Sequence, residues 1–176
     1  MRRNSIGIVV LTAAFASTPA SAQDRAAVIA NALQAAPASI AEAAAVMDWE
    51  GNTLREGTSG WVCFPDPPNM EAAPMCLDET WLAWADAWQK KQPVTIDRPG
   101  IAYMLLGDAG ASNVDPFAEG PTADNEWVVT GPHLMLIVPD PASLAELSTD
   151  PKNGGPWVMW LGTPYAHVMI PVAAKQ

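Results

Sequence analysis

Two predicted strands in the last third of the chain alternate aliphatic side chains with a histidine and a methionine. The first strand carries His133 and Met135, the second carries His167 and Met169, and the chain has only these two histidines. Because successive side chains of a strand point to opposite faces, each His shares a face with its Met. The other face of both strands is aliphatic, and we expect these aliphatic faces to point into the core.

The hydrophobic pattern of the whole chain predicts a mixture of helices and strands. In chain order we expect a helix over 24–36, a second helix from a Ser39–Glu42 capping box to about Met47, a hairpin of 53–56 with 61–64, a helix over 77–91, a buried strand over 101–106, a polar loop over 107–126, a strand over 133–138, a short helix from Asp140, and a terminal hairpin of 157–160 with 165–172. This order predicts an α+β fold, with an antiparallel sheet of about five or six strands covered on one face by helices.

The helix predicted over 77–91 carries three tryptophans on one side. Trp81, Trp84 and Trp88 follow a spacing of three and four residues, so their indoles line one helix face. Such a stripe could line a groove for a sugar or an aromatic ligand. We expect it to pack into the core instead, because a helix buries its bulkiest apolar face.

The N-terminus has the pattern of an export signal. A basic start at Arg2 and Arg3 is followed by an apolar stretch, and by small residues at 20–22. The apolar stretch is too short to remain across a bilayer. We therefore predict a signal peptide over 1–22, a single globular domain over 23–176, and a periplasmic or secreted location with no membrane association after cleavage.

The mature chain is strongly acidic. Cleavage removes Arg2 and Arg3, which leaves seven basic and nineteen acidic residues, a net charge of −12 with neutral histidines. A surface of this sign repels nucleic acid and anionic membranes, so neither is expected as a partner. The acidic residues are scattered along the chain, which is typical of a solubilising surface.

Cys63 and Cys76 are the only cysteines. In an oxidising compartment, an even pair at short separation predicts a disulfide. Their spacing does not match a redox CxxC motif or a closed zinc site.

The two His-Met strands are the best candidates for a metal site. Imidazole and thioether ligands together suit copper, and Cu(I) in particular, so His133, Met135, His167 and Met169 form the predicted ligand set. The His-x-Met motif is similar to part of the ligand pattern of periplasmic copper chaperones, although the rest of their motif is absent. The alternative is structural, with each His bonded to a backbone carbonyl and each Met filling a gap beside it.

A hydrolase would have to use the same two histidines. Ser112 with Asp108, in the polar loop, could complete a Ser-His-Asp site with His133 or His167, but no motif selects this arrangement. The enzyme hypothesis therefore stays the minority one, and we assign no catalytic residue and no required cofactor, copper being the candidate cofactor.

The favoured hypothesis is a non-catalytic domain that binds a small ligand or a protein partner. The eight tryptophans indicate a large aromatic core and could supply an aromatic-lined pocket. The candidate ligand-binding residues are His133, His167, Tyr165 and Tyr103. The loop over 107–126 adds a further region of interest, because loops of this length are usually functional or disordered.

Overall fold

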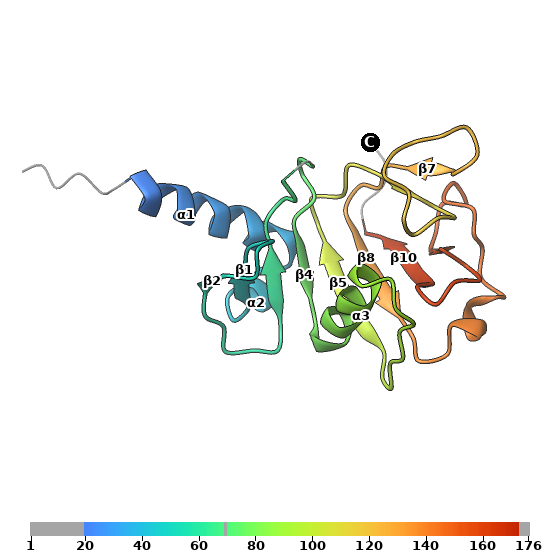
Figure 1. Ribbon diagram of the computed structural model, residues 1–176, viewed down its shortest axis with the longest axis horizontal. Coiled ribbons are helices and arrows are strands. Elements are labelled where there is room, and N and C mark those ends of the chain that lie inside the picture. The colour runs from blue at the N-terminus through green and yellow to red at the C-terminus, as the bar shows by residue number, and fades with distance from the viewer. Residues whose placement is uncertain (1–19, 69, 173–176) are drawn as a thin grey trace, which may run out of the picture.

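The computed structural model describes residues 20–68 and 70–172 (Figure 1). Most of the predicted signal peptide therefore lies outside the described residues. The helices are α1 (Ala20–Ala32), α2 (Ala38–Ala41) and α3 (Glu79–Gln89), and two short 3-10 helices are η1 (Leu33–Ala35) and η2 (Pro141–Leu144). The strands are β1 (Ala45–Met47), β2 (Thr53–Arg55), β3 (Val62–Phe64), β4 (Met75–Leu77), β5 (Gly100–Met104), β6 (Ala111–Ser112), β7 (Trp127–Val128), β8 (His133–Ile137), β9 (Trp157–Met159) and β10 (His167–Pro171).

Eight of these strands form one sheet in the order β2-β1-β3-β4-β5-β8-β10-β9. Neighbouring strands are antiparallel except β1 and β3, which are parallel. A separate two-stranded sheet joins β6 and β7. The α+β class is confirmed, but the sheet is mixed and wider than the five or six strands predicted.

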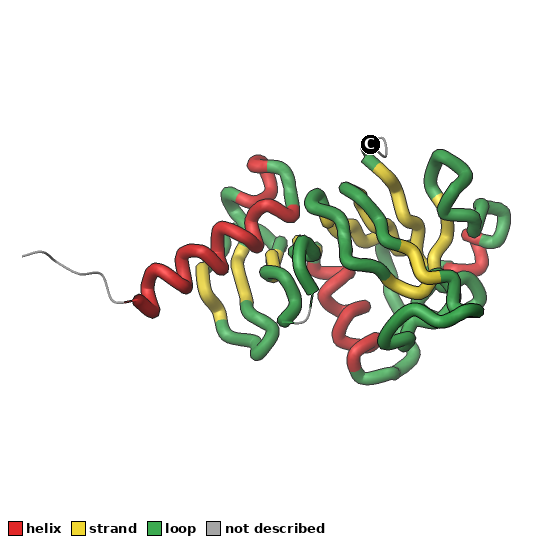
Figure 2. Tube along the Cα trace, turned by 90° about the horizontal axis from the view of Figure 1, so that it is seen from above, coloured by secondary structure: helices red, strands yellow, loops and turns green. Residues whose placement is uncertain are grey.

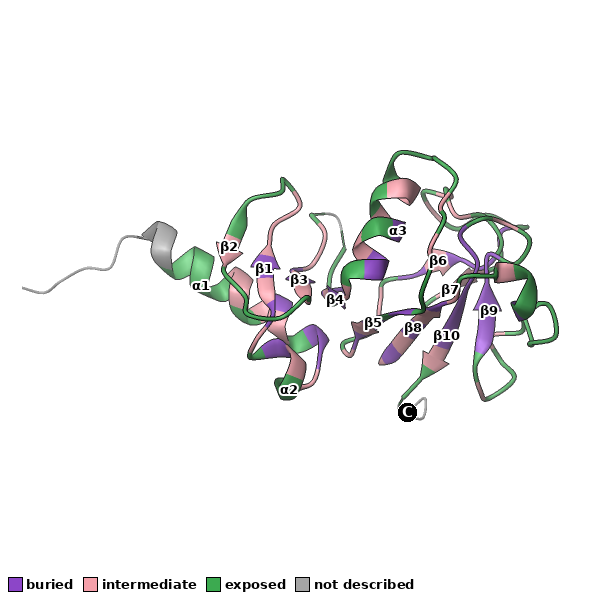
Figure 3. Cartoon of the chain, turned by 90° about the horizontal axis from the view of Figure 1, so that it is seen from below, coloured by how far each residue is buried: buried purple, intermediate pink, exposed green. Residues whose placement is uncertain are grey.

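The helices cover different parts of the two sheet faces. Cys63, Cys76 and Tyr103 are register partners and share a face, against which η1 and its neighbours pack. The opposite face, which includes Leu77 and Ala102, packs against α3. Figure 3 shows α2 and α3 on opposite sides of the strands. The prediction that helices cover a single face is therefore not supported.

The largest hydrophobic cluster lies between α3 and the sheet. Trp81 and Trp84 are buried in it and Trp88 packs at its margin, so the predicted packing of the tryptophan stripe is confirmed. The helix starts where the Asp78 side chain accepts a hydrogen bond from the Trp81 backbone amide. The main core is thus largely aromatic.

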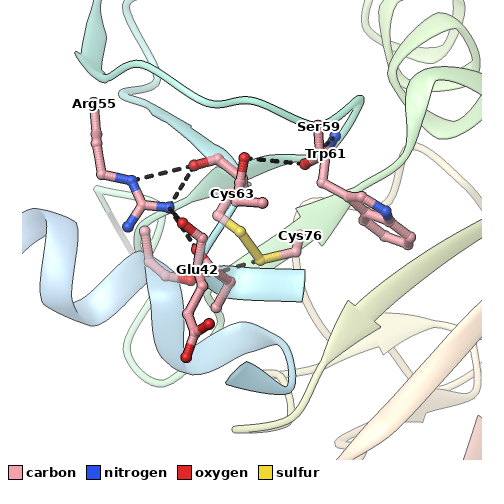
Figure 4. Close-up of a disulfide and its surroundings, with 10 residues drawn as sticks. Glu42, Arg55, Ser59, Trp61, Cys63 and Cys76 are labelled. Atoms are coloured by element: carbon pink, nitrogen blue, oxygen red, sulfur yellow. Dashed lines mark hydrogen bonds between the residues drawn. A yellow bond between two sulfur atoms is a disulfide. The ribbon is translucent and has the colours of Figure 1, made fainter. Parts of the chain in front are cut away.

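The predicted helix reaching Met47 is wrong beyond Ala41. Residues 45–47 form β1, which lies between β2 and β3. The guanidinium of Arg55 donates to the carbonyl oxygens of Ala41, Glu42 and Ala44, as Figure 4 shows. Carbonyls at a helix end need such donors, so a distant arginine supports the early end of α2. The Ser39–Glu42 capping box is also absent, because α2 begins after Pro37 without a side-chain cap.

The predicted hairpin of 53–56 with 61–64 is also wrong. Both segments are strands, but β2 and β3 each pair with β1 instead of with each other. The Gly57 backbone lies so close to residues 43–45 that a side chain there would clash. The glycine therefore permits this connection to pack against the start of β1.

The Cys63–Cys76 disulfide is confirmed (Figure 4). The two cysteines are directly opposite each other on β3 and β4, and both are fully buried. The bridge therefore joins two neighbouring strands beneath η1 and closes the proline-rich connection over 65–74.

The C-terminal half follows the prediction more closely. Strands β9 and β10 pair as the terminal hairpin, and the Asp140 side chain caps η2. Viewed from above, α1 extends at one end of the molecule and most of the long loops gather at the other (Figure 2). Among the described helices, none is long and apolar enough to cross a membrane.

Candidate functional site

The two His-Met strands are neighbours in the sheet. In the register of β8 with β10, Met135 is opposite Met169 and His133 is opposite Pro171. Directly opposite residues of antiparallel strands share a face, so all four predicted ligands lie on one face. The paired methionines separate the histidines, with His133 two positions to one side and His167 two positions to the other.

Both faces of these strands are covered, whereas only the aliphatic faces were expected to point into a core. The His-Met face packs into the aromatic core beneath α3. The aliphatic face packs into a smaller cluster with η2, as expected, where Ala166 and Val168 are buried and Leu136 is half-buried. The His-Met face is buried because α3 brings three indoles to it. Neutral imidazoles and thioethers pack well against aromatic rings.

His167 is enclosed by aromatic rings. Its imidazole stands edge-on to Trp81, Trp84 and Trp160, with ring centroids 5.5, 5.7 and 4.9 Å away. Its Nδ1 lies 3.0 Å from the carbonyl oxygen of Tyr165, which can only accept, so Nδ1 donates. Burial lowers the pKa of His167 from 6.5 to about 4, which keeps the ring neutral at physiological pH.

His133 is fully buried and faces a carboxylate. Its Nδ1 donates to the carbonyl oxygen of Gly131 at 2.7 Å, and its Nε2 lies 3.9 Å from Asp108 Oδ2. Burial lowers the pKa of His133, and the Gly131 carbonyl and the Asp108 charge partly oppose this shift. Burial also raises the pKa of Asp108, against hydrogen bonds from the Thr130 and Gly110 amides and the nearby imidazole.

Ser112 has a structural role that accounts for its hydroxyl group. Ser112 Oγ donates to the Asn125 carbonyl oxygen at 2.6 Å and accepts from the amides of Val114 and Asp115. The side chain is buried. A serine nucleophile needs a free hydroxyl beside a base, and this hydroxyl instead organises the loop that follows.

The two predicted tyrosines lie in different clusters. Tyr165 is buried in the main aromatic core, and its hydroxyl donates to the Gln92 carbonyl oxygen at 2.8 Å. Tyr103 lies on the other face of the sheet, half-buried against Trp61. The structure therefore brings Tyr165 near His167 but keeps Tyr103 apart from both.

A metal site of the usual kind is not apparent. Within residues 20–68 and 70–172, no three His, Cys, Asp or Glu side chains converge where they could hold an ion. The predicted copper site differs from such a cluster, because two of its four ligands are methionine thioethers. Copper binding by His133, Met135, His167 and Met169 therefore stays a prediction.

The loop over 107–126 forms an open concavity of about 510 Å³, lined by residues between Val114 and Asn125. We call it the loop concavity. The Asn125 side chain holds its shape by donating to the Gly120 carbonyl oxygen and accepting from the Thr122 amide. Three carboxylates, those of Asp115, Glu119 and Asp124, lie in its lining.

Asn113 fixes this loop to the sheet. Its side-chain amide donates to Glu126 and to the Thr149 carbonyl oxygen, and its Oδ1 accepts from the Trp157 indole. Sequence reasoning missed both asparagines, Asn113 and Asn125, because they look like ordinary turn formers. The sequence feature that pointed to this region was the length of the loop over 107–126, because loops of this length are usually functional or disordered.

Comparison with known proteins gives no relative. No family model, no curated protein and no solved structure matches the chain.

Proposed function

We propose that the mature chain is an exported, non-catalytic domain that binds a small, positively charged molecule in the loop concavity. The observation that carries the proposal is the concavity itself. Its volume of about 510 Å³ is large enough to admit a small molecule, and its open shape would leave such a ligand partly exposed. One ordered loop lines it, and that loop is held in place by Ser112, Asn113 and Asn125.

The charge of the lining supports a cationic ligand. Asp115, Glu119 and Asp124 contribute carboxylates beside the apolar side chains of Val114 and Pro121. The acidic mature chain would also attract cations over a longer range. A ligand with amino groups on an aliphatic stem would match both parts of this lining.

The surroundings of the histidines argue against catalysis. His133 and His167 are 0 % and 2 % exposed, so neither can reach a substrate as a general base. The hydroxyl group of Ser112 is engaged in loop contacts. A binding role therefore requires fewer rearrangements than a hydrolytic one.

The test is a titration of the mature, disulfide-bonded protein with spermidine, followed by NMR of the backbone amides. We expect the largest shifts at residues 114–125. The variant Glu119→Gln/Asp124→Asn should weaken binding roughly tenfold, because each exposed ion pair is worth up to about 1 kcal/mol. A matched control, Glu42→Gln/Glu71→Gln, removes two exposed charges outside the loop concavity.

The two double variants separate a specific site from general charge attraction. Equal weakening in both would mean that spermidine senses only the net charge, and the proposal would fail. It would also fail if the shifts were spread over the whole acidic surface.

A further inference from the structure

The loop over 107–130 leaves and rejoins the sheet through a narrow neck, formed by residues 107–108 and 130–131. The Asp108 amide donates to the Thr130 carbonyl oxygen, and the Thr130 amide donates back to Asp108 Oδ1, both at 2.9 Å. The Gly110 amide donates to the same Oδ1 at 3.0 Å. One carboxylate oxygen is thus fixed by two backbone amides, and the carboxylate has a single orientation.

The other carboxylate oxygen faces His133. Because His133 Nδ1 donates to the Gly131 carbonyl, the neutral ring presents Nε2 as an acceptor. Nε2 is buried, has no hydrogen-bond partner within the described part of the chain, and lies 3.9 Å from Asp108 Oδ2. Two acceptors therefore face each other in a largely buried position. Such an arrangement is costly unless something positive lies between them.

We propose that His133 Nε2 and Asp108 Oδ2 bind a divalent transition-metal ion of the Zn²⁺ or Cu²⁺ class. Their separation of 3.9 Å is too long for a hydrogen bond, and with two metal–ligand bonds of about 2.1 Å it corresponds to a ligand–metal–ligand angle of roughly 135°, which a closure of a few tenths of an ångström would bring toward tetrahedral. A single ion therefore fits between the two atoms. An imidazole nitrogen with a carboxylate oxygen suits Zn²⁺ and Cu²⁺, and disfavours Mg²⁺ and Ca²⁺, which take oxygen ligands.

Both ligands already have the supporting contacts of a metal site. A metal-binding histidine usually donates its other ring N–H to a carbonyl or carboxylate, and ligating carboxylates are themselves hydrogen-bonded. His133 does the first through Gly131, and Asp108 does the second through Oδ1. The ion would also offset the cost of the buried carboxylate charge.

Two further groups lie beside the pair. Thr130 Oγ1 is buried, and its hydroxyl lies beside the Asp108 carboxylate. Met104 is the register partner of His133 on β5 and is buried on the same face of the sheet, which makes its thioether a candidate soft ligand. The Asp108 side chain is 14 % exposed, which provides the route for an ion to enter.

This site differs from the copper set predicted from the sequence. It requires Asp108, which that set lacks, and it does not require His167 or Met169. The inference is also independent of the loop concavity, since no ligand atom of the neck lines that concavity. Variants of Asp108, of His167 and of the carboxylates of the loop concavity therefore separate the neck site, the copper set and the cation site.

The experiment is calorimetric titration of the chelator-treated mature chain with Zn²⁺ and with Cu²⁺. We expect one ion per chain. Asp108→Asn should weaken binding at least about tenfold, since even the loss of an outer contact costs about 10–100-fold. This variant keeps Oδ1 as an acceptor for the Thr130 and Gly110 amides, and circular dichroism will show whether it is folded.

His167→Gln is the matched control. His167 is an equally buried imidazole whose Nδ1 also donates to a carbonyl, but it lacks a facing carboxylate. It should bind Zn²⁺ like the wild type. In the wild type, NMR of the imidazole nitrogens should show that Zn²⁺ perturbs Nε2 of His133 and not of His167. Absence of stoichiometric binding in the wild type, or equal affinity of Asp108→Asn, would overturn the proposal.

Discussion

At the scale of the residue, His167 shows how a polar side chain can serve as core. Three indoles and the Tyr165 carbonyl oxygen surround it, and only its neutral form fits that environment. The sequence identified both histidines as unusual because each follows the His-x-Met pattern. It could not show that their faces point inward, because that depends on which side of the sheet α3 covers.

The buried imidazole of His167 makes the stability of the fold depend on pH. Its pKa is about 4 in the folded chain and near 6.5 in the unfolded chain, so the unfolded state takes up the proton first. The stabilising contribution is complete above pH 6.5 and is lost as the pH falls toward 4. We expect the loss of this contribution to lower the free energy of unfolding by about 3 kcal/mol over that interval.

The measurement is urea unfolding at several pH values between 7 and 4. His167→Gln should show a smaller loss of stability than the wild type over this range, whatever its stability at pH 7. Met169→Leu, a neighbouring core substitution without a titrating group, should keep the pH dependence of the wild type. Parallel curves for wild type and His167→Gln would contradict the assignment.

At the scale of the element, the local sequence pattern in the N-terminal half predicts a different secondary structure from the one that strand pairing produces. Alanine-rich residues 38–47 favour a helix, yet 45–47 form a strand, because there they pair with both β2 and β3 and bury Val46 in the cluster around η1. Arg55 then satisfies the carbonyl groups at the end of α2. In contrast, α3 is set by local signals, from its Asp78 cap to its tryptophan stripe, and was predicted well.

The disulfide should contribute much of the stability of this half, where strands have only three residues. It closes a loop with a sequence separation of 13. The chain-entropy model gives about 3 kcal/mol for such a loop. We expect Cys63→Ala/Cys76→Ala to lower the free energy of unfolding by at least this amount, because both side chains are also buried.

Chemical denaturation of the double variant and of the reduced wild type will check this prediction. The two should lose similar stability, and the m-value should rise as the unfolded chain becomes more expanded. A loss below about 1 kcal/mol in both would show that η1 and the surrounding strands hold together without the bridge.

At the scale of the whole molecule, the fold class could be predicted but the strand order could not. Insertion of β1 between β2 and β3, and of β8 between β5 and β10, depends on pairings between segments far apart in sequence. The same holds for the candidate site. The sequence contains Asp108 and His133, 25 positions apart, but only the closed neck of the loop brings them face to face.

Export is the remaining prediction at this scale, and the N-terminal helix allows a specific test. We expect cleavage after Ala22, which would remove only the first residues of α1. The rest of α1 should stay docked, because Arg25 donates to the carbonyl oxygens of Thr53 and Leu54, and Ile29 packs beside the disulfide together with Leu33 of η1.

The full chain should be expressed with its own N-terminus in a Gram-negative host, and the periplasmic protein analysed by intact mass. We expect a chain that begins at Gln23 and lacks the two thiol hydrogens of Cys63 and Cys76. Ala22→Glu should block processing, because the cleavage site requires small residues, whereas Ala26→Glu should be processed normally. A full-length cytoplasmic chain with two free thiols would show that the N-terminus is not an export signal.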